Sequence, residues 1–223
     1  MAVLAPKPHL LRVNVAARQE FDYDWRTDDS EDVARLVCTA QSVRGGNVLW
    51  RVQRFDPDDD GKLQKSPSYD VLSEMDDRNR RTNAPEKVKA DKTSFGASEE
   101  ARKGIHLVMS YLNLNYPKGK RSVGEGWRDH RPHPFKKGRE YFVDYKLLKD
   151  DVREKAWNCY EIEFSSSVSI GNAGKEIHAE GKSKVERSTG MPVDLELTVT
   201  GMDAVSESLP DDIEVRLTRG GDE

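Results

Sequence analysis

Residues 176–200 read EIHAEGKSKVERSTGMPVDLELTVT, and polar and apolar side chains alternate almost without error. Up to Glu186 the even positions hold charged residues or His, and the odd positions hold small or apolar residues. After a break at Ser188–Gly190, valine and leucine again take the odd positions, 193, 195, 197 and 199. A period of two with one apolar and one charged face predicts a half-buried antiparallel β-hairpin.

The charges of this hairpin select its register. In one register Lys184 faces Asp194 and Lys182 faces Glu196, and both pairs attract. A shift by two residues brings two carboxylates opposite each other, which repel. The first register leaves a three-residue loop that ends at Gly190, where a left-handed backbone favours glycine. We therefore predict the first register, with its even face in water.

Composition places the chain among β-rich domains with a modest apolar supply. The 223 residues are 35% hydrophobic and 34% charged, with a formal net charge of −4. This length fits one large domain or two small ones, and we expect a single domain over residues 1–223. The acidic balance argues against a globally cationic nucleic-acid binder. No apolar run is long enough to span a bilayer. The first residues lack signal-peptide features, which predicts a cytoplasmic protein if Met1 is the native start, or an envelope protein whose signal was removed.

The first half of the chain contains one strong hairpin signal. Val33–Arg44 and Asn47–Phe55 flank Gly45-Gly46, and two glycines permit the positive φ values of a primed turn. Leu10–Phe21 is predicted as a further strand, and the acidic Glu20–Asp32 as a polar loop. Residues 56–97 read as a long excursion, either functional or mobile, because prolines recur and large apolar residues are few. Within it we expect one short helical turn, containing Val71, Leu72 and Met75.

The second half begins with a predicted helix at Ser98, whose side chain can cap the free amides. Apolar residues follow at helical spacing, and Pro117 ends the element. The helix residues are Ala101, Ile105, Val108, Met109 and Leu112. The expected strands after the Tyr116–Gly138 loop are Tyr141–Leu148, Ala156–Ile170 and Ile213–Thr218, with a charged connection at Lys149–Lys155 and a partly ordered segment over 203–223.

These elements predict the fold class. We expect a mainly β domain (α+β) built as a large curved antiparallel sheet or sandwich of hairpins, with one or two helices packed on it. The two cysteines, Cys38 and Cys159, fall in separate strands, where they are either buried free thiols or one disulfide.

An acidic turn resembles the start of a calcium loop. Asp56, Asp58 and Asp60 take the first, third and fifth positions, and Gly61 and Leu63 the sixth and eighth. The twelfth position, where such loops place a bidentate Glu, holds Pro67. Calcium and an ordinary acidic turn are both compatible with this pattern.

Lys118–Arg139 is the cationic segment, with eight Lys and Arg residues against Glu125 and Asp129. Basic residues interleaved with aromatics are typical of surfaces for anions, nucleic acids or acidic partners. The alternatives are a solvated loop, or pairing with acidic Glu20–Asp32 within one molecule or between neighbours. The candidate anion- or partner-binding residues are Lys118, Lys120, Arg121, Trp127, Arg128, Arg131, Lys136, Lys137 and Arg139. Here His130 and His133 also offer two imidazoles to a metal, although Arg128 and Arg131 would repel a cation.

Two turn motifs, HPFKKGREY at 133–141 and STGMP at 188–192, resemble uncharacterised bacterial cell-envelope proteins of the lipoprotein type. Those proteins carry P-V-K-x-G-D-x-W and D-x-x-T-G-x-P at the corresponding places. Phe135, Arg139, Glu140 and Tyr141 differ from that pattern, and Arg187 stands where an acid is common. The resemblance covers about residues 98–202. It implies a large curved sheet and an envelope location, and it implies no activity.

No nucleophile elbow, phosphate-binding loop, dinucleotide fingerprint or Cys/His dyad occurs in the sequence. We therefore expect a non-enzymatic protein that binds a protein partner or assembles with copies of itself through its sheet and charged loops. One alternative is a carrier of an apolar ligand in a half-barrel pocket lined by Val185, Leu195, Leu197 and Val199. Another is a polyanion or nucleic-acid binder that uses the cationic segment.

Overall fold

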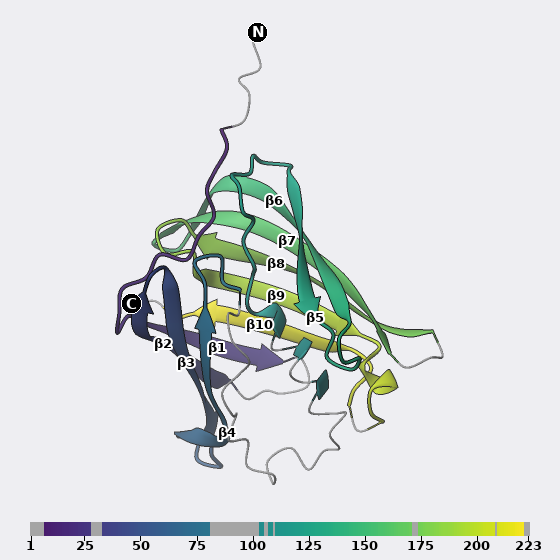
Figure 1. Ribbon diagram of the computed structural model, residues 1–223. Coiled ribbons are helices and arrows are strands. Elements are labelled where there is room, and N and C mark those ends of the chain that lie inside the picture. The colour runs from purple at the N-terminus through teal and green to yellow at the C-terminus, as the bar shows by residue number, and fades with distance from the viewer. Residues whose placement is uncertain are drawn as a thin grey trace.

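The computed structural model describes residues 7–27, 33–80, 103–104, 107–108, 110–170, 174–207 and 209–220. They form one antiparallel sheet whose strand order is β4-β3-β2-β1-β10-β9-β8-β7-β6-β5 (Figure 1). The strands are β1 (Glu20–Thr27), β2 (Ala34–Arg44), β3 (Asn47–Pro57), β4 (Leu63–Met75), β5 (Gly126–Pro132), β6 (Glu140–Glu154), β7 (Trp157–Ile170), β8 (Lys175–Glu186), β9 (Pro192–Thr200) and β10 (Ile213–Arg219). The mainly β fold predicted from the sequence is confirmed.

Two meanders, β1–β4 and β5–β9, make up most of this sheet. Strand β10 joins them, because it pairs with β9 on one side and β1 on the other. The predicted turn at Gly45-Gly46 connects β2 to β3, with φ values of 58° and 87° at the two glycines. Both values lie in the left-handed region, as a primed two-residue turn requires.

The register predicted for the β8–β9 hairpin is confirmed. Lys184 pairs with Asp194 and Lys182 with Glu196. Near the turn the register shifts by one residue, so that Val185 pairs with Pro192. The amide of Gly190 donates to the carbonyl of Glu186, and Gly190 has a φ of 72°. The loop is therefore longer than the three residues expected, although glycine stands where the backbone is left-handed.

The inner face of the sheet carries the hydrophobic core. In β8 and β9 this face is formed by Ile177, Ala179, Val185, Leu195, Leu197 and Val199, each 0–2% exposed. Helical residues 103–104, 107–108 and 110–111 cross this face, and Leu107, Val108 and Tyr111 belong to the same core. The N-terminal segment adds Leu11 and Val13. The start of the predicted helix, including Ser98, lies outside the described residues.

Several expected boundaries were wrong. Residues 10–16 are not a strand, although Leu11 and Val13 are buried. Strand β1 instead occupies Glu20–Thr27, within the predicted acidic loop, and Phe21, Tyr23 and Trp25 face the core. The charged side chains between these residues lie on the outer face, because successive side chains of a strand point to opposite faces of the sheet.

The long excursion is also partly a strand. Strand β4 pairs with β3 through Leu72 and Met75, so the helical turn predicted there is wrong. The connection was expected at Lys149–Lys155, but strand β6 continues through Glu154. The turn between β6 and β7 therefore consists of Lys155 and Ala156. Residues 81–97 of the excursion lie outside the described residues. The last predicted strand is β10, at the centre of the sheet.

Cys38 and Cys159 are both free thiols, on β2 and β7. Cys159 has no exposed surface. Among the described residues, no helix has the length and apolar character needed to cross a membrane.

Candidate binding surface

The structure divides the predicted cationic segment into exposed and buried residues. Lys118, Lys120, Arg128, Lys137 and Arg139 are exposed, and Arg121 and Lys136 are partly exposed. Trp127 and Arg131, in contrast, are 8% and 7% exposed. Both lie on β5, where odd-numbered side chains face inward. Their predicted place on an exposed binding surface is therefore corrected.

Trp127 is a packing residue. Its ring stacks on Tyr145 with a centroid distance of 5.2 Å and an interplanar angle of 7°. Its indole nitrogen donates to the carbonyl of Asn115 at 2.8 Å. Because both the ring face and the N–H group are occupied, Trp127 has no face with which to stack on a nucleic-acid base.

Arg131 holds the helical residues against the sheet. Its guanidinium donates to the carbonyls of Ser110 and Asn113, each at 2.7 Å, and to the hydroxyl of Tyr145 at 2.5 Å. Carbonyls at the end of a helix lack partners within the helix, so a cation there stabilises it. Burial acts to lower the pKa of Arg131, but Tyr145 and Tyr141 raise it further, so the group stays charged.

The two histidines of the cationic segment support the β5–β6 hairpin. The Nδ1 atom of His133 accepts the amides of Phe135 and Lys136, and its Nε2 lies 3.0 Å from the carbonyl of Ser169. His130 contacts Glu140 at 3.2 Å. The structure thus assigns both rings local partners.

The predicted calcium turn connects β3 to β4. Asp56 pairs with Arg54 at 2.5 Å. Asp58 accepts the side chain of Gln64 and the amides of Lys62 and Asp60, and these hydrogen bonds lower its pKa. Within the described ranges, no group of three or more His, Cys, Asp or Glu side chains could hold a metal. Calcium binding here stays a prediction.

The inner face is filled by the chain itself. The four residues predicted to line an apolar pocket are Val185, Leu195, Leu197 and Val199, and each is at most 2% exposed. They share one core with the helical residues Leu107, Val108 and Tyr111. A carrier would need an apolar void at these four residues, and side chains occupy that space.

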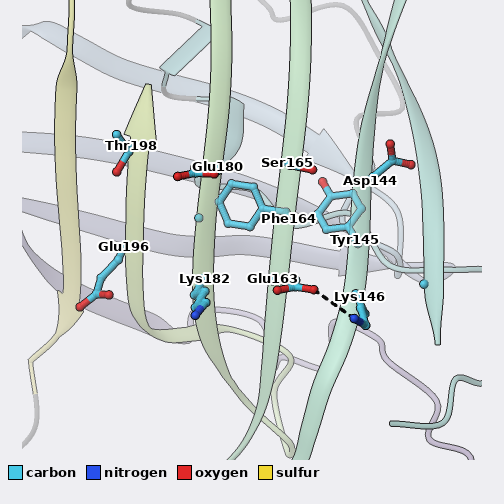
Figure 2. Close-up of a pocket in the computed structure, with 12 residues that line it drawn as sticks. Asp144, Tyr145, Lys146, Glu163, Phe164, Ser165, Glu180, Lys182, Glu196 and Thr198 are labelled. Atoms are coloured by element: carbon cyan, nitrogen blue, oxygen red, sulfur yellow. Dashed lines mark ion pairs between the residues drawn. The ribbon is translucent and has the colours of Figure 1, made fainter. Parts of the chain in front are cut away.

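The outer face of β5–β9 is hollowed into a groove of about 820 Å³. Its charged and polar lining comes from Asp144, Lys146, Glu163, Ser165, Glu180, Lys182, Glu196 and Thr198. Figure 2 shows these side chains on neighbouring strands, with Tyr145 and Phe164 also at the site. We call it the outer groove.

The side chains of the outer groove form two rows across the strands. In one row Lys146, Glu163, Lys182 and Glu196 face one another in register, with alternating sign. The other row is Asp144, Ser165, Glu180 and Thr198. Neighbouring strands lie about 4.8 Å apart, so each row is a closely spaced ladder of polar groups (Figure 2).

The centre of the outer groove keeps unpaired groups of both signs. Lys146 pairs with Glu163 at 3.6 Å, and Asp144 binds Arg128 through two hydrogen bonds of 2.6 and 2.8 Å. Lys182 and Glu180, by contrast, have no ion pair or side-chain hydrogen bond to another described residue. An ammonium and a carboxylate two residues apart on one strand face can together bind a ligand that carries both charges.

Strand β1 belongs to the acidic segment Glu20–Asp32, and strand β5 to the cationic segment Lys118–Arg139. Several strands separate β1 from β5 in the sheet. Strand β1 pairs with β2 and β10, whereas β5 forms the edge beyond β6. Asp22 is bound by Arg35 of β2, not by a residue of the cationic segment. Pairing of the two segments within one molecule is therefore not seen among the described residues.

No protein-family model and no curated protein matches this chain. The resemblance to envelope proteins therefore stays a prediction from the two turn motifs.

Proposed function

We propose that this chain is a non-enzymatic binding protein that recognises a protein partner on the outer face of β5–β9. The observation that carries the proposal is the contrast between the two faces of the sheet. The inner face is packed, whereas the outer groove is open and holds Lys182 and Glu180, which form no ion pair with another residue that the structure describes. Unpaired charges in a recess offer specific contacts without the cost of breaking an existing ion pair.

The chemistry of the outer groove favours a protein as the partner. Its lining mixes carboxylates, ammoniums and hydroxyls, so a single-sign polymer such as a nucleic acid would meet repulsion at every second position of the first row. The exposed aromatic Phe142 lies on the same face of β6, at the margin of the surface. Aromatic and Arg side chains are enriched where proteins bind each other most strongly.

A photocrosslinking amino acid at Ser165 tests this function. Irradiation in an extract of the native cells crosslinks this residue to proteins that bind at the outer groove. The control is the same photocrosslinking amino acid at Arg26, on the outer face of β1. A protein captured from Ser165 alone is purified, and its affinity is measured by calorimetry. We expect Lys182→Glu to weaken binding about tenfold, and Lys175→Glu, outside the groove, to leave it within about twofold.

Equal capture from both labels, or equal affinity of the two charge variants, would contradict recognition through the outer groove. Circular dichroism of each variant checks that the sheet is retained, since both lysines are exposed.

A further inference from the structure

In the part of the chain that the structure describes, strand β5 ends the sheet and has β6 as its one neighbouring strand. The amide of Leu147 donates to the carbonyl of Glu125, and the amide of His133 to that of Arg139. Because antiparallel pairs alternate between hydrogen-bonded and non-hydrogen-bonded positions, the odd residues of β5 direct their backbone groups to β6. Gly126, Arg128 and His130 therefore direct theirs away from the sheet. Within the ranges that the structure describes, these backbone groups have no partner.

The chain already adds an extended segment just before this edge. The amide of His9 donates to the carbonyl of Arg121 at 2.7 Å, and the amide of Arg121 to that of His9 at 2.8 Å. His9 is fixed there by Asp150 of β6 at 2.7 Å, and Arg12 donates to the carbonyl of Pro117 at 2.6 Å. An extended backbone thus fits beside residue 121, and from His9 to Arg12 the segment runs past Pro117 and Lys118, away from β5.

The surroundings of the β5 edge are cationic. Arg128 and His130 point to its outer face, and exposed basic residues lie before and after the strand. Seven Lys and Arg residues lie here outside the core, against Glu125, Asp129, Glu140 and Asp144. They are Lys118, Lys120, Arg121, Arg128, Lys136, Lys137 and Arg139. This balance attracts an acidic segment.

Two neighbouring side chains add a fixed contact surface. The guanidinium of Arg128 lies 5.3 Å from the ring centre of Phe142, held there by Asp144, and His130 packs against the same ring at 4.7 Å. Phe142 is 43% exposed. A second copy of this chain is a poor occupant, because antiparallel pairing of two β5 strands centred on Asp129 brings Arg128 opposite His130.

We propose that the free edge of β5 binds an extended acidic segment of the protein partner by strand addition. This rests on the proposed function and names the chemistry of the partner segment. The backbone of Gly126, Arg128 and His130 supplies the hydrogen bonds, and the basic side chains select acidic residues. Pro132 has no amide and ends the site.

The probe is an eight-residue peptide of alternating Glu and Thr, titrated into the full chain and followed by NMR at the β5 amides. The decisive variant is His130→Pro, which removes one outward amide without touching a hydrogen bond to β6. The matched control is His130→Ala, which removes the ring and keeps the amide. We expect His130→Pro to bind about tenfold more weakly than His130→Ala.

Two peptide controls keep the test independent of variant folding. Methylation of alternate peptide amides should abolish binding, and replacement of Glu by Lys should do the same. Wild-type protein that shows no binding at millimolar peptide overturns the proposal, as does equal binding of the methylated peptide or of His130→Pro. The peptide tests can fail while Lys182→Glu still lowers the affinity for the captured protein. In that case the outer groove stays the proposed binding site, and strand addition at β5 is rejected.

Discussion

The ring of Phe164 covers the position where Gly181 lacks a side chain. The two residues pair directly across β7 and β8. A Cβ atom at Gly181 would lie 2.5 Å from Cζ of Phe164 and 2.5 Å from the carbonyl oxygen of Glu196. The aromatic ring thus fills, from the next strand, the core volume that the glycine leaves open, beneath the outer groove.

This contact predicts that Gly181→Ala destabilises the protein by about 1–3 kcal/mol, because the new methyl group overpacks the core. Urea unfolding followed by tryptophan fluorescence measures the change. Gly119→Ala is the matched control, since its Cβ would meet only the end of the Arg121 side chain at 3.6 Å. An equal loss in the two variants would mean that both Phe164 and the backbone at Glu196 move aside without cost.

Arg131→Met is expected to cost about 2–4 kcal/mol of unfolding free energy. The substitution removes the buried guanidinium that donates to the carbonyls of Ser110 and Asn113. The carbonyl of Ser110 keeps the amide of Asn113, but the carbonyl of Asn113 and the hydroxyl of Tyr145 lose this donor, which is costly near the core. Arg128→Met, on the exposed side of the same strand, serves as the control and should change stability little. Hydrogen exchange at residues 110–116 should rise in Arg131→Met alone. Unchanged exchange there would show that Arg131 does not hold the helical residues.

The sequence could predict elements whose signal is local. The β8–β9 hairpin carries its alternation, charge pairs and turn glycine within 25 residues, and its register followed from them. Strand β1 carried the same alternation in Phe21, Tyr23 and Trp25. We predicted a loop there because the segment is rich in acidic residues. The regular spacing of those residues, which indicates the outer face of a strand, was given less weight.

The outer groove had no local signal. Its lining comes from five strands, β5 to β9, and depends on how they align. The error at Trp127 and Arg131 has the same origin. Their inward direction follows from the period of β5, and a segment rich in proline, glycine and basic residues hides that period until its pairing with β6 is known.

Glu186 should make stability depend on pH. Burial raises its pKa, but hydrogen bonds from Ser188, Arg219 and Thr189 lower it further, so the net shift is downward. A carboxyl group with a lowered folded pKa contributes stability above its unfolded pKa of about 4.5, and that contribution is lost as pH falls through the folded value. Its partner Arg219 is 2.6 Å away and 6% exposed.

Glu186→Gln should therefore be less stable than wild type at pH 7, with a difference that stays nearly constant down to about pH 4.5 and shrinks below it. Urea unfolding at a series of pH values measures this difference. The exposed Glu176→Gln is the comparison, since it lacks an arginine partner in the core. If the difference between Glu186→Gln and wild type also stayed constant below about pH 4.5, Glu186 would not contribute to the pH dependence of stability.

The two thiols should react only after unfolding. Burial raises the pKa of Cys159 to about 11 and that of Cys38 to about 12. Thiolate is the reactive form, so at pH 8 both residues are almost entirely protonated. Native protein should thus take up a disulfide reagent such as Ellman's reagent slowly, and unfolding in urea should release two rapid equivalents. One equivalent that reacts rapidly in the folded protein would contradict this prediction. Cys38→Ser would then show whether Cys38 is the reactive thiol, as expected from the lack of exposed surface at Cys159.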